Sequence, residues 1–143
     1  MRTGLTTLGH GLVAAARALG VRHLLGKENT LDHLCQLVAE ALAERLAVGL
    51  RTVFARHGRP LCVTQVGART EFQFTPTPPR NGSEADRILN PALEQNIHLY
   101  LLNRGLVITP FHNMMLVCPD TTADDVDRLV AGMEAFVVDT IAP

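Results

Sequence analysis

The chain has 143 residues, of which 47% are hydrophobic and 19% are charged, and its formal net charge at pH 7 is −1. This size and apolar content predict one folded domain with a buried core and exclude a disordered segment. The near balance of 13 basic and 14 acidic residues offers no basic surface for nucleic acid or for an anionic membrane.

Two helices are predicted first. Residues 12–25 are rich in alanine and leucine and favour a short helix. The clearest helix is predicted from about residue 30 to residue 57, where apolar residues recur at helical spacing and form one stripe. Asn29 or Thr30 would cap its start, and Gly58 would end it. The members of the stripe are Leu31, Leu34, Val38, Leu42, Leu46, Leu50, Val53 and Phe54.

Two strands are predicted next, at residues 61–66 and 70–75, with Gly67 between them as a turn or bulge. The second of these strands places Phe72 and Phe74 on one face and polar residues on the other. Four residues of the following segment, 76–82, are proline or glycine, which predicts a loop.

A further helix is predicted from Pro91 to Gly105, because Asn90 suits an N-cap and proline suits the first helical position. Residues 106–109 and 114–118 are apolar runs of strand length around the turn PFHN, which predicts a hairpin or a strand pair joined by an irregular loop.

The last predicted helix opens at Thr122, which forms a capping-box pattern with Asp125. Its apolar stripe consists of Val126, Leu129, Val130, Met133 and Val137.

The predicted order of elements favours an α+β fold. We expect an antiparallel or mixed sheet of about four strands with helices packed mainly on one face, because the links between adjacent strands are too short for parallel pairing. An alanine-rich helix and a long amphipathic helix precede this sheet in the sequence.

The three cysteines, Cys35, Cys62 and Cys118, are scattered and lack a CxxC spacing. They predict buried free thiols and argue against a disulfide framework or a metal site. The chain begins without a signal-peptide pattern, and no run approaches the roughly 18 apolar residues of a membrane span. We therefore expect a cytoplasmic protein.

Three segments together resemble the class III pyridoxal-phosphate aminotransferases, the family that includes the glutamate-1-semialdehyde aminomutases and bacterial chains labelled aspartate aminotransferase family. The segments are VTQVGARTEFQF (63–74), HLYLLNRGLVITPFHNMM (98–115) and CPDTTADDVDRL (118–129). The resemblance implies that residues 1–143 are the C-terminal small domain, with residues 1–26 a remnant of the segment that joins the large domain. The implied reaction transfers an amino group between an amine or amino acid and an oxo compound.

The resemblance also implies pyridoxal phosphate as cofactor and a large domain or full-length subunit as partner, in a homodimer. In the family a threonine ahead of an alanine-rich helix binds the cofactor phosphate, and Thr6 or Thr7 in TTLGHGLVAAA would match it. A hydroxyl and backbone amides at a helix N-terminus can hold an anion, although either threonine could equally cap the helix.

Three further residues are candidates for substrate binding. His112 and Asn113 in the PFHN turn match a family loop that approaches the substrate, and imidazole can exchange a proton near neutral pH. Arg69 in GARTEF could clamp a substrate carboxylate through two hydrogen bonds. The alternatives are a hydrogen-bonded turn histidine and a strand arginine paired with Glu71 or solvent.

Lys27 is the only lysine of the chain, and it does not lie where the family keeps the lysine that holds the cofactor. Because transamination needs such an amine, we expect this chain alone to be inactive and not to bind the cofactor covalently. The alternative is a free-standing, non-catalytic α+β module that binds a partner protein or a small ligand. The sequence contains no HExxH or GxSxG motif, which argues against a hydrolase.

Overall fold

The structure is a computed structural model that describes residues 11, 14, 18 and 31–140. Within the described chain the elements are α2 (Leu31–Arg56), β1 (Cys62–Val66), β2 (Arg69–Gln73), α3 (Gly82–Arg87), α4 (Pro91–Leu102), β3 (Met114–Leu116) and α5 (Ala123–Thr140). The strands form an antiparallel sheet in the order β1-β2-β3. The α+β class is therefore confirmed, while most of the helix predicted at residues 12–25 lies outside the described residues.

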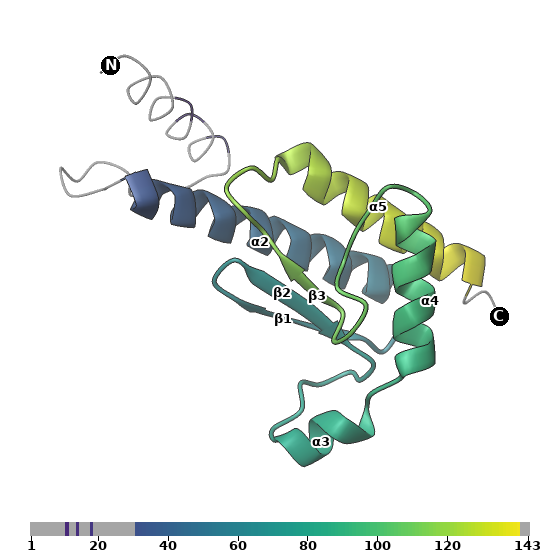
Figure 1. Ribbon diagram of the computed structural model, residues 1–143. Coiled ribbons are helices and arrows are strands. Elements are labelled where there is room, and N and C mark those ends of the chain that lie inside the picture. Colours follow the sequence, from purple (N-terminus) through teal and green to yellow (C-terminus); the bar gives the residue numbers. More distant parts are fainter. Residues whose placement is uncertain (1–10, 12–13, 15–17, 19–30, 141–143) are drawn as a thin grey trace.

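The helices pack mainly on one face of the sheet, as predicted. Helix α2 crosses behind β1 and β2, α5 packs along α2, and α4 contacts α5 (Figure 1). Phe54 of α2, Phe72 of β2 and Phe136 of α5 are almost completely buried between these layers. The rings of Phe54 and Phe72 meet edge to face with their centroids 5.6 Å apart, so the aromatic contact joins helix and sheet.

Helices α2 and α4 end in the same way. After α2, Gly58 has φ +61, the Arg59 amide donates to the Phe54 carbonyl at 2.8 Å, and the Gly58 amide donates to Ala55 at 3.1 Å. Gly105 has φ +74 after α4, and a corresponding bond joins the Leu106 amide to the Leu101 carbonyl. These are Schellman motifs, which need a left-handed residue that glycine adopts without strain.

The helix starts at Asn90 and Thr122 are confirmed. Asn90 Oδ1 accepts a hydrogen bond from the Leu93 amide at 3.1 Å, with Pro91 opening α4. Thr122 Oγ1 accepts from the Asp125 amide at 3.2 Å, and Asp125 Oδ2 accepts from the Thr122 amide at 3.0 Å. This reciprocal pair is the predicted capping box.

The hairpin of β1 and β2 turns through Gly67 and Ala68, with Val66 opposite Arg69. Gly67 has φ +57, as the first central residue of a two-residue hairpin loop requires. Thr70 is fully buried, and its hydroxyl donates to the Ala43 carbonyl at 3.2 Å, which ties the sheet to α2.

The prediction of a fourth strand at residues 106–109 is wrong. This segment runs beside β3 (Figure 1). Within the described chain, one backbone hydrogen bond joins the segment to β3, from the Thr109 amide to the Met114 carbonyl at 3.4 Å. The Leu106 amide is used to end α4, and the Ile108 carbonyl accepts from His98 Nδ1 at 2.9 Å. These bonds hold the segment in place without a ladder.

Helix α3 was not predicted, because it follows a proline-rich segment. Asn81 Oδ1 accepts from the Glu84 amide at 3.0 Å, and the Glu84 carboxylate binds Arg80 Nη2 at 2.9 Å. The pattern of asparagine followed three residues later by glutamate could have indicated this start. None of the helices in the described chain is long and apolar enough to cross a membrane.

Candidate functional site

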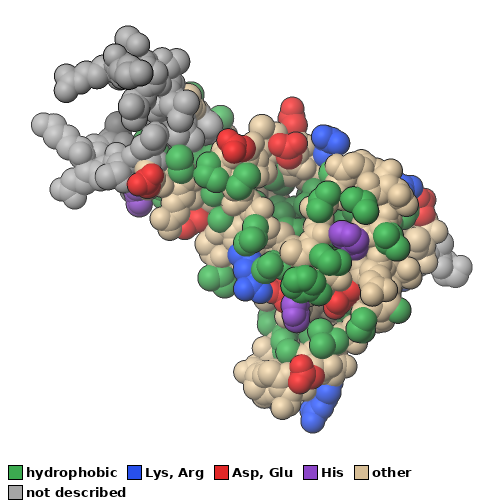
Figure 2. Space-filling model, viewed as in Figure 1, with side chains coloured by type: hydrophobic (Ala, Val, Ile, Leu, Met, Phe, Trp, Pro, Cys, Tyr) green, Lys and Arg blue, Asp and Glu red, His purple; other side chains and the backbone are tan. Residues whose placement is uncertain are grey.

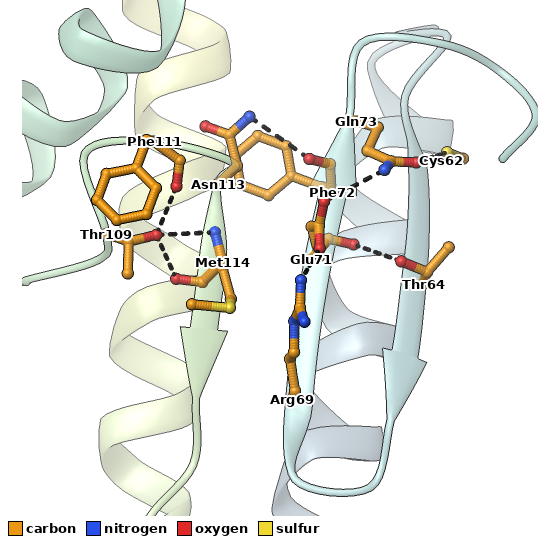
Figure 3. Close-up of polar contacts among 10 residues, drawn as sticks. All are labelled: Cys62, Thr64, Arg69, Glu71, Phe72, Gln73, Thr109, Phe111, Asn113 and Met114. Atoms are coloured by element: carbon orange, nitrogen blue, oxygen red, sulfur yellow. Dashed lines mark hydrogen bonds and ion pairs between the residues drawn. The ribbon is translucent and has the colours of Figure 1, made fainter. Parts of the chain in front are cut away.

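The PFHN turn is held in a defined conformation at the start of β3. Thr109 Oγ1 accepts from the Met114 amide at 3.1 Å and donates to the Phe111 carbonyl at 2.7 Å (Figure 3). His112 and Asn113 have φ +58 and +46, a left-handed conformation that asparagine and histidine adopt more readily than most residues. The turn therefore presents its side chains from a fixed backbone.

Asn113 is the residue that joins this turn to the sheet. Its side chain is 2% exposed, and Nδ2 donates to the Phe72 carbonyl at 3.4 Å (Figure 3). The register pairs Thr70 with Met115, so Phe72 would next face Asn113 across the ladder. The side-chain amide thus donates the hydrogen bond that a backbone amide would donate if the pairing of β2 and β3 continued to this position.

A small pocket of about 80 Å³ lies where the turn, β2, α3 and the start of α4 meet. Three of its lining residues are acidic, and none is lysine or arginine. Such a wall accepts hydrogen bonds from a protonated amine and repels a carboxylate. The lining residues are Glu71, Phe72, Gln73, Phe74, Ala85, Asp86, Ile88, Leu89, Glu94, His112 and Asn113.

The structure brings His112 and Asn113 to this pocket, but Arg69 does not line it. Arg69 lies on the outer face of β2, where its Nη2 binds Glu71 Oε2 at 2.6 Å (Figure 3). Gln73 Nε2 donates to the other carboxylate oxygen at 3.2 Å. Arg69 therefore reaches the wall of the pocket only through Glu71, and the substrate-binding role of all three candidates stays a prediction.

Thr6, Thr7 and Lys27 lie outside the described residues. Glu94 also lines the pocket, is 7% exposed and was not predicted from the sequence. Its position in the first turn of α4, where the helix dipole favours a carboxylate, gives it an ordinary structural explanation, so its sequence pattern carries no functional signal.

The cysteines differ in environment. Cys62 is buried, and burial raises the pKa of its thiol. Cys118 is exposed, and a hydrogen bond with Thr121 lowers its thiol pKa, so the expectation of buried thiols is wrong for this residue. It follows the end of β3, where the chain turns over the surface. In the described part of the chain no group of histidine, cysteine and acidic residues could hold a metal ion.

The arrangement of the described elements is that of a part of the class III pyridoxal-phosphate aminotransferases, and the resemblance seen in the sequence is confirmed. The chain is similar to about a third of the length of a solved protein of this family.

The matched structures include a glutamate-1-semialdehyde aminomutase from Pseudomonas aeruginosa, also solved in complex with PMP, which is 31% identical with a TM-score of 0.69. The match covers 88% of this chain and 34% of that protein. A β-phenylalanine aminotransferase from Variovorax paradoxus is 28% identical over 80% of this chain and 26% of its own, with a TM-score of 0.61.

An omega-transaminase from Sphaerobacter thermophilus, 20% identical, shows the fold alone, with a TM-score of 0.61 over 73% of this chain and 24% of its own. No protein-family model and no curated protein matches the sequence. The chain thus spans about a third of the length of the aminomutase.

Proposed function

We propose that this chain is the C-terminal small domain of a pyridoxal-phosphate-dependent aminotransferase, with residues 1–26 joining it to the large domain. In this proposal it acts in the cytoplasm, within a homodimer whose large domains carry the cofactor, and its reaction moves an amino group between an amine or amino acid and an oxo compound. The observation that supports this best is the 31% identity to the aminomutase over 88% of the chain.

His112 and Asn113 are proposed to stand at the substrate entrance. Asn113 holds the turn to the Phe72 carbonyl, which leaves the exposed imidazole of His112 free to exchange hydrogen bonds with a substrate. Arg69 can bind a substrate carboxylate only by exchanging it for Glu71, its partner at 2.6 Å. The acidic pocket beside the turn favours an amino donor as the group bound there.

The described residues do not by themselves fit pyridoxal phosphate. Residues 31–140 contain no lysine, and the pocket beside His112 is small and acidic, which opposes a phosphate. Contact with the cofactor phosphate is therefore proposed for Thr6 or Thr7, and the covalent link for the large domain. When bound there, the cofactor would supply the group that accepts and returns the amino group.

The covalent part of this proposal can be tested on the full chain alone. Pyridoxal phosphate followed by borohydride should label Lys27 no more than the N-terminal amine, because an ordinary surface lysine lacks the environment that activates it. A Lys27→Arg variant controls for labelling at the N-terminus. Stoichiometric labelling of Lys27, or turnover of an amino donor by the isolated chain, would contradict the proposal.

The catalytic part is tested by co-expressing the chain with the portion of the Pseudomonas aminomutase that it does not cover. We expect the two pieces to co-purify and to transfer amino groups only together. An assembled pair without activity, with cofactor bound, would argue against a catalytic role for this chain.

The alternative, a non-catalytic binding module, is favoured by one observation. Val66 and Leu116 on the outer face of the sheet are 79% and 67% exposed, and Figure 2 shows hydrophobic side chains over this side of the molecule. Light scattering on the chain at high concentration tests it, since a clean monomer would argue against an obligate partner surface.

A further inference from the structure

A groove of about 580 Å³ separates β3 from the extended segment that follows α4. It lies where the predicted fourth strand fails to pair, with the first half of α5 as its floor. Val107 on one wall is 75% exposed and Leu116 on the other is 67% exposed. Most of the lining surface is apolar, and the lining residues include Leu106, Ile108, Met115, Val117, Val126 and Leu129.

The backbone of β3 directs unused hydrogen-bonding groups toward this groove. The Val117 amide donates to the Ala68 carbonyl at 3.0 Å, so Val117 faces β2 across the ladder. In an antiparallel ladder alternate residues face opposite sides, and Leu116 therefore points its N–H and C=O away from β2. Within residues 31–140 neither group has a hydrogen-bond partner.

The other edge of the sheet is partly blocked. The Val63 carbonyl of β1 accepts hydrogen bonds from Arg51 Nη2 at 3.1 Å and from Arg51 Nε at 3.3 Å. A charged side chain of α2 thus occupies an outward acceptor of β1. On β3, Thr109 binds the outward groups of Met114, and the outward groups of Leu116 border the groove. An open edge with an apolar groove beside it is the arrangement to which an additional strand binds.

We propose that an extended segment of the remaining part of the aminotransferase adds to β3 at Leu116, beyond the point where Thr109 binds Met114, pairs with the backbone of Leu116 and fills the groove. This inference rests on the proposed function. Two observations argue for this occupant. The outward N–H and C=O of Leu116 suit pairing with a strand, and about two thirds of the matched aminomutase lies outside the region that this chain covers.

Hydrogen exchange of the full chain gives the first test. The Leu116 amide should exchange rapidly in the chain alone and become protected when the chain is co-expressed with the uncovered portion of the Pseudomonas aminomutase. Protection of this amide in the monomeric chain alone would overturn the inference, because the edge would already be paired.

Two substitutions separate strand addition from simple apolar contact. Leu116→Pro removes the outward N–H without removing a bond to β2, and we expect it to reduce recovery of the complex about tenfold or more. Leu116→Ser keeps the N–H and should reduce recovery much less. Leu99→Ser on α4, where the side chain is 54% exposed, is the matched surface control. Circular dichroism checks that each variant is folded.

The outcomes are distinct. Equal recovery of the Leu116→Pro and Leu116→Ser variants would overturn strand addition and leave the proposed function standing. If no complex forms at all, both the inference and the proposed partner are overturned.

Discussion

At the scale of single residues, Asn113 shows how one side chain does two things at once. It accepts a left-handed backbone and supplies the donor that the buried Phe72 carbonyl would otherwise lack. The sequence indicated Asn113 only through its family resemblance. The hydrogen bond from Asn113 to Phe72 could not be predicted, because the two residues are 41 positions apart and meet only through the pairing of β2 with β3.

We predict that Asn113→Ala lowers the free energy of unfolding by about 2 kcal/mol, since it removes the donor to a buried carbonyl and replaces asparagine with a residue that tolerates the left-handed conformation less well. Asn113→Gly should cost about 1 kcal/mol less, because glycine accepts this conformation. Urea unfolding of both variants measures the difference. Equal losses would show that backbone strain plays no part.

At the scale of elements, helix ends were predictable and the fourth strand was not. Asn90, Thr122 and Gly58 act within a few residues of themselves, so their roles can be read locally. Whether residues 106–109 join a sheet depends on His98, which takes the Ile108 carbonyl from another element. The pocket likewise combines β2, α3 and α4 with the turn, and no local pattern reports such a meeting.

The contact between α2 and α5 depends on a close approach at Gly49. A Cβ there would lie 2.6 Å from Val130 Cγ2 and 3.1 Å from Val130 Cγ1. Because the valine side chain is stiff at χ1, we predict that Gly49→Ala destabilises the protein by about 1–2 kcal/mol despite its better helix propensity.

Gly132→Ala is the matched control for this prediction. Its Cβ would meet Leu106 Cδ1 at 2.6 Å and Leu101 Cδ2 at 3.1 Å, but both methyl groups are the ends of flexible side chains. We expect a change within about 1 kcal/mol of zero, the size of the propensity gain. The midpoints of thermal unfolding of the two variants test this prediction. A Gly49→Ala protein that is more stable than the parent would contradict a close approach of α2 and α5 at Gly49.

At the scale of the whole molecule, ion pairs between α2 and α5 make stability depend on pH. Hydrogen bonds from Arg45 lower the pKa of Asp127, and hydrogen bonds from His57 and then Arg56 lower that of Glu134. A lowered carboxyl pKa stabilises the folded state above the ordinary values of 3.8 and 4.5. This stabilisation is lost as the pH falls below those values.

We therefore predict that the urea midpoint falls between pH 5 and pH 3, and that Arg45→Gln makes this fall smaller. Arg87→Gln on α3 changes the charge equally. Among the described residues Arg87 makes no ion pair with α5, so this variant should leave the pH dependence unchanged. An Arg45→Gln variant with the slope of the parent protein would show that the Arg45–Asp127 pair, 2.7 Å apart, contributes nothing in solution.

The packing of α4 on α5 can be followed by the fluorescence of one tyrosine. Tyr100 is the single tyrosine of the chain, which has no tryptophan. Its ring lies edge to face on Phe136 at 5.3 Å, the Arg104 guanidinium lies 3.5 Å above it, and its hydroxyl donates to Asp139. Intrinsic fluorescence therefore comes from this one junction, and its intensity will follow the separation of these two helices during unfolding without any attached dye.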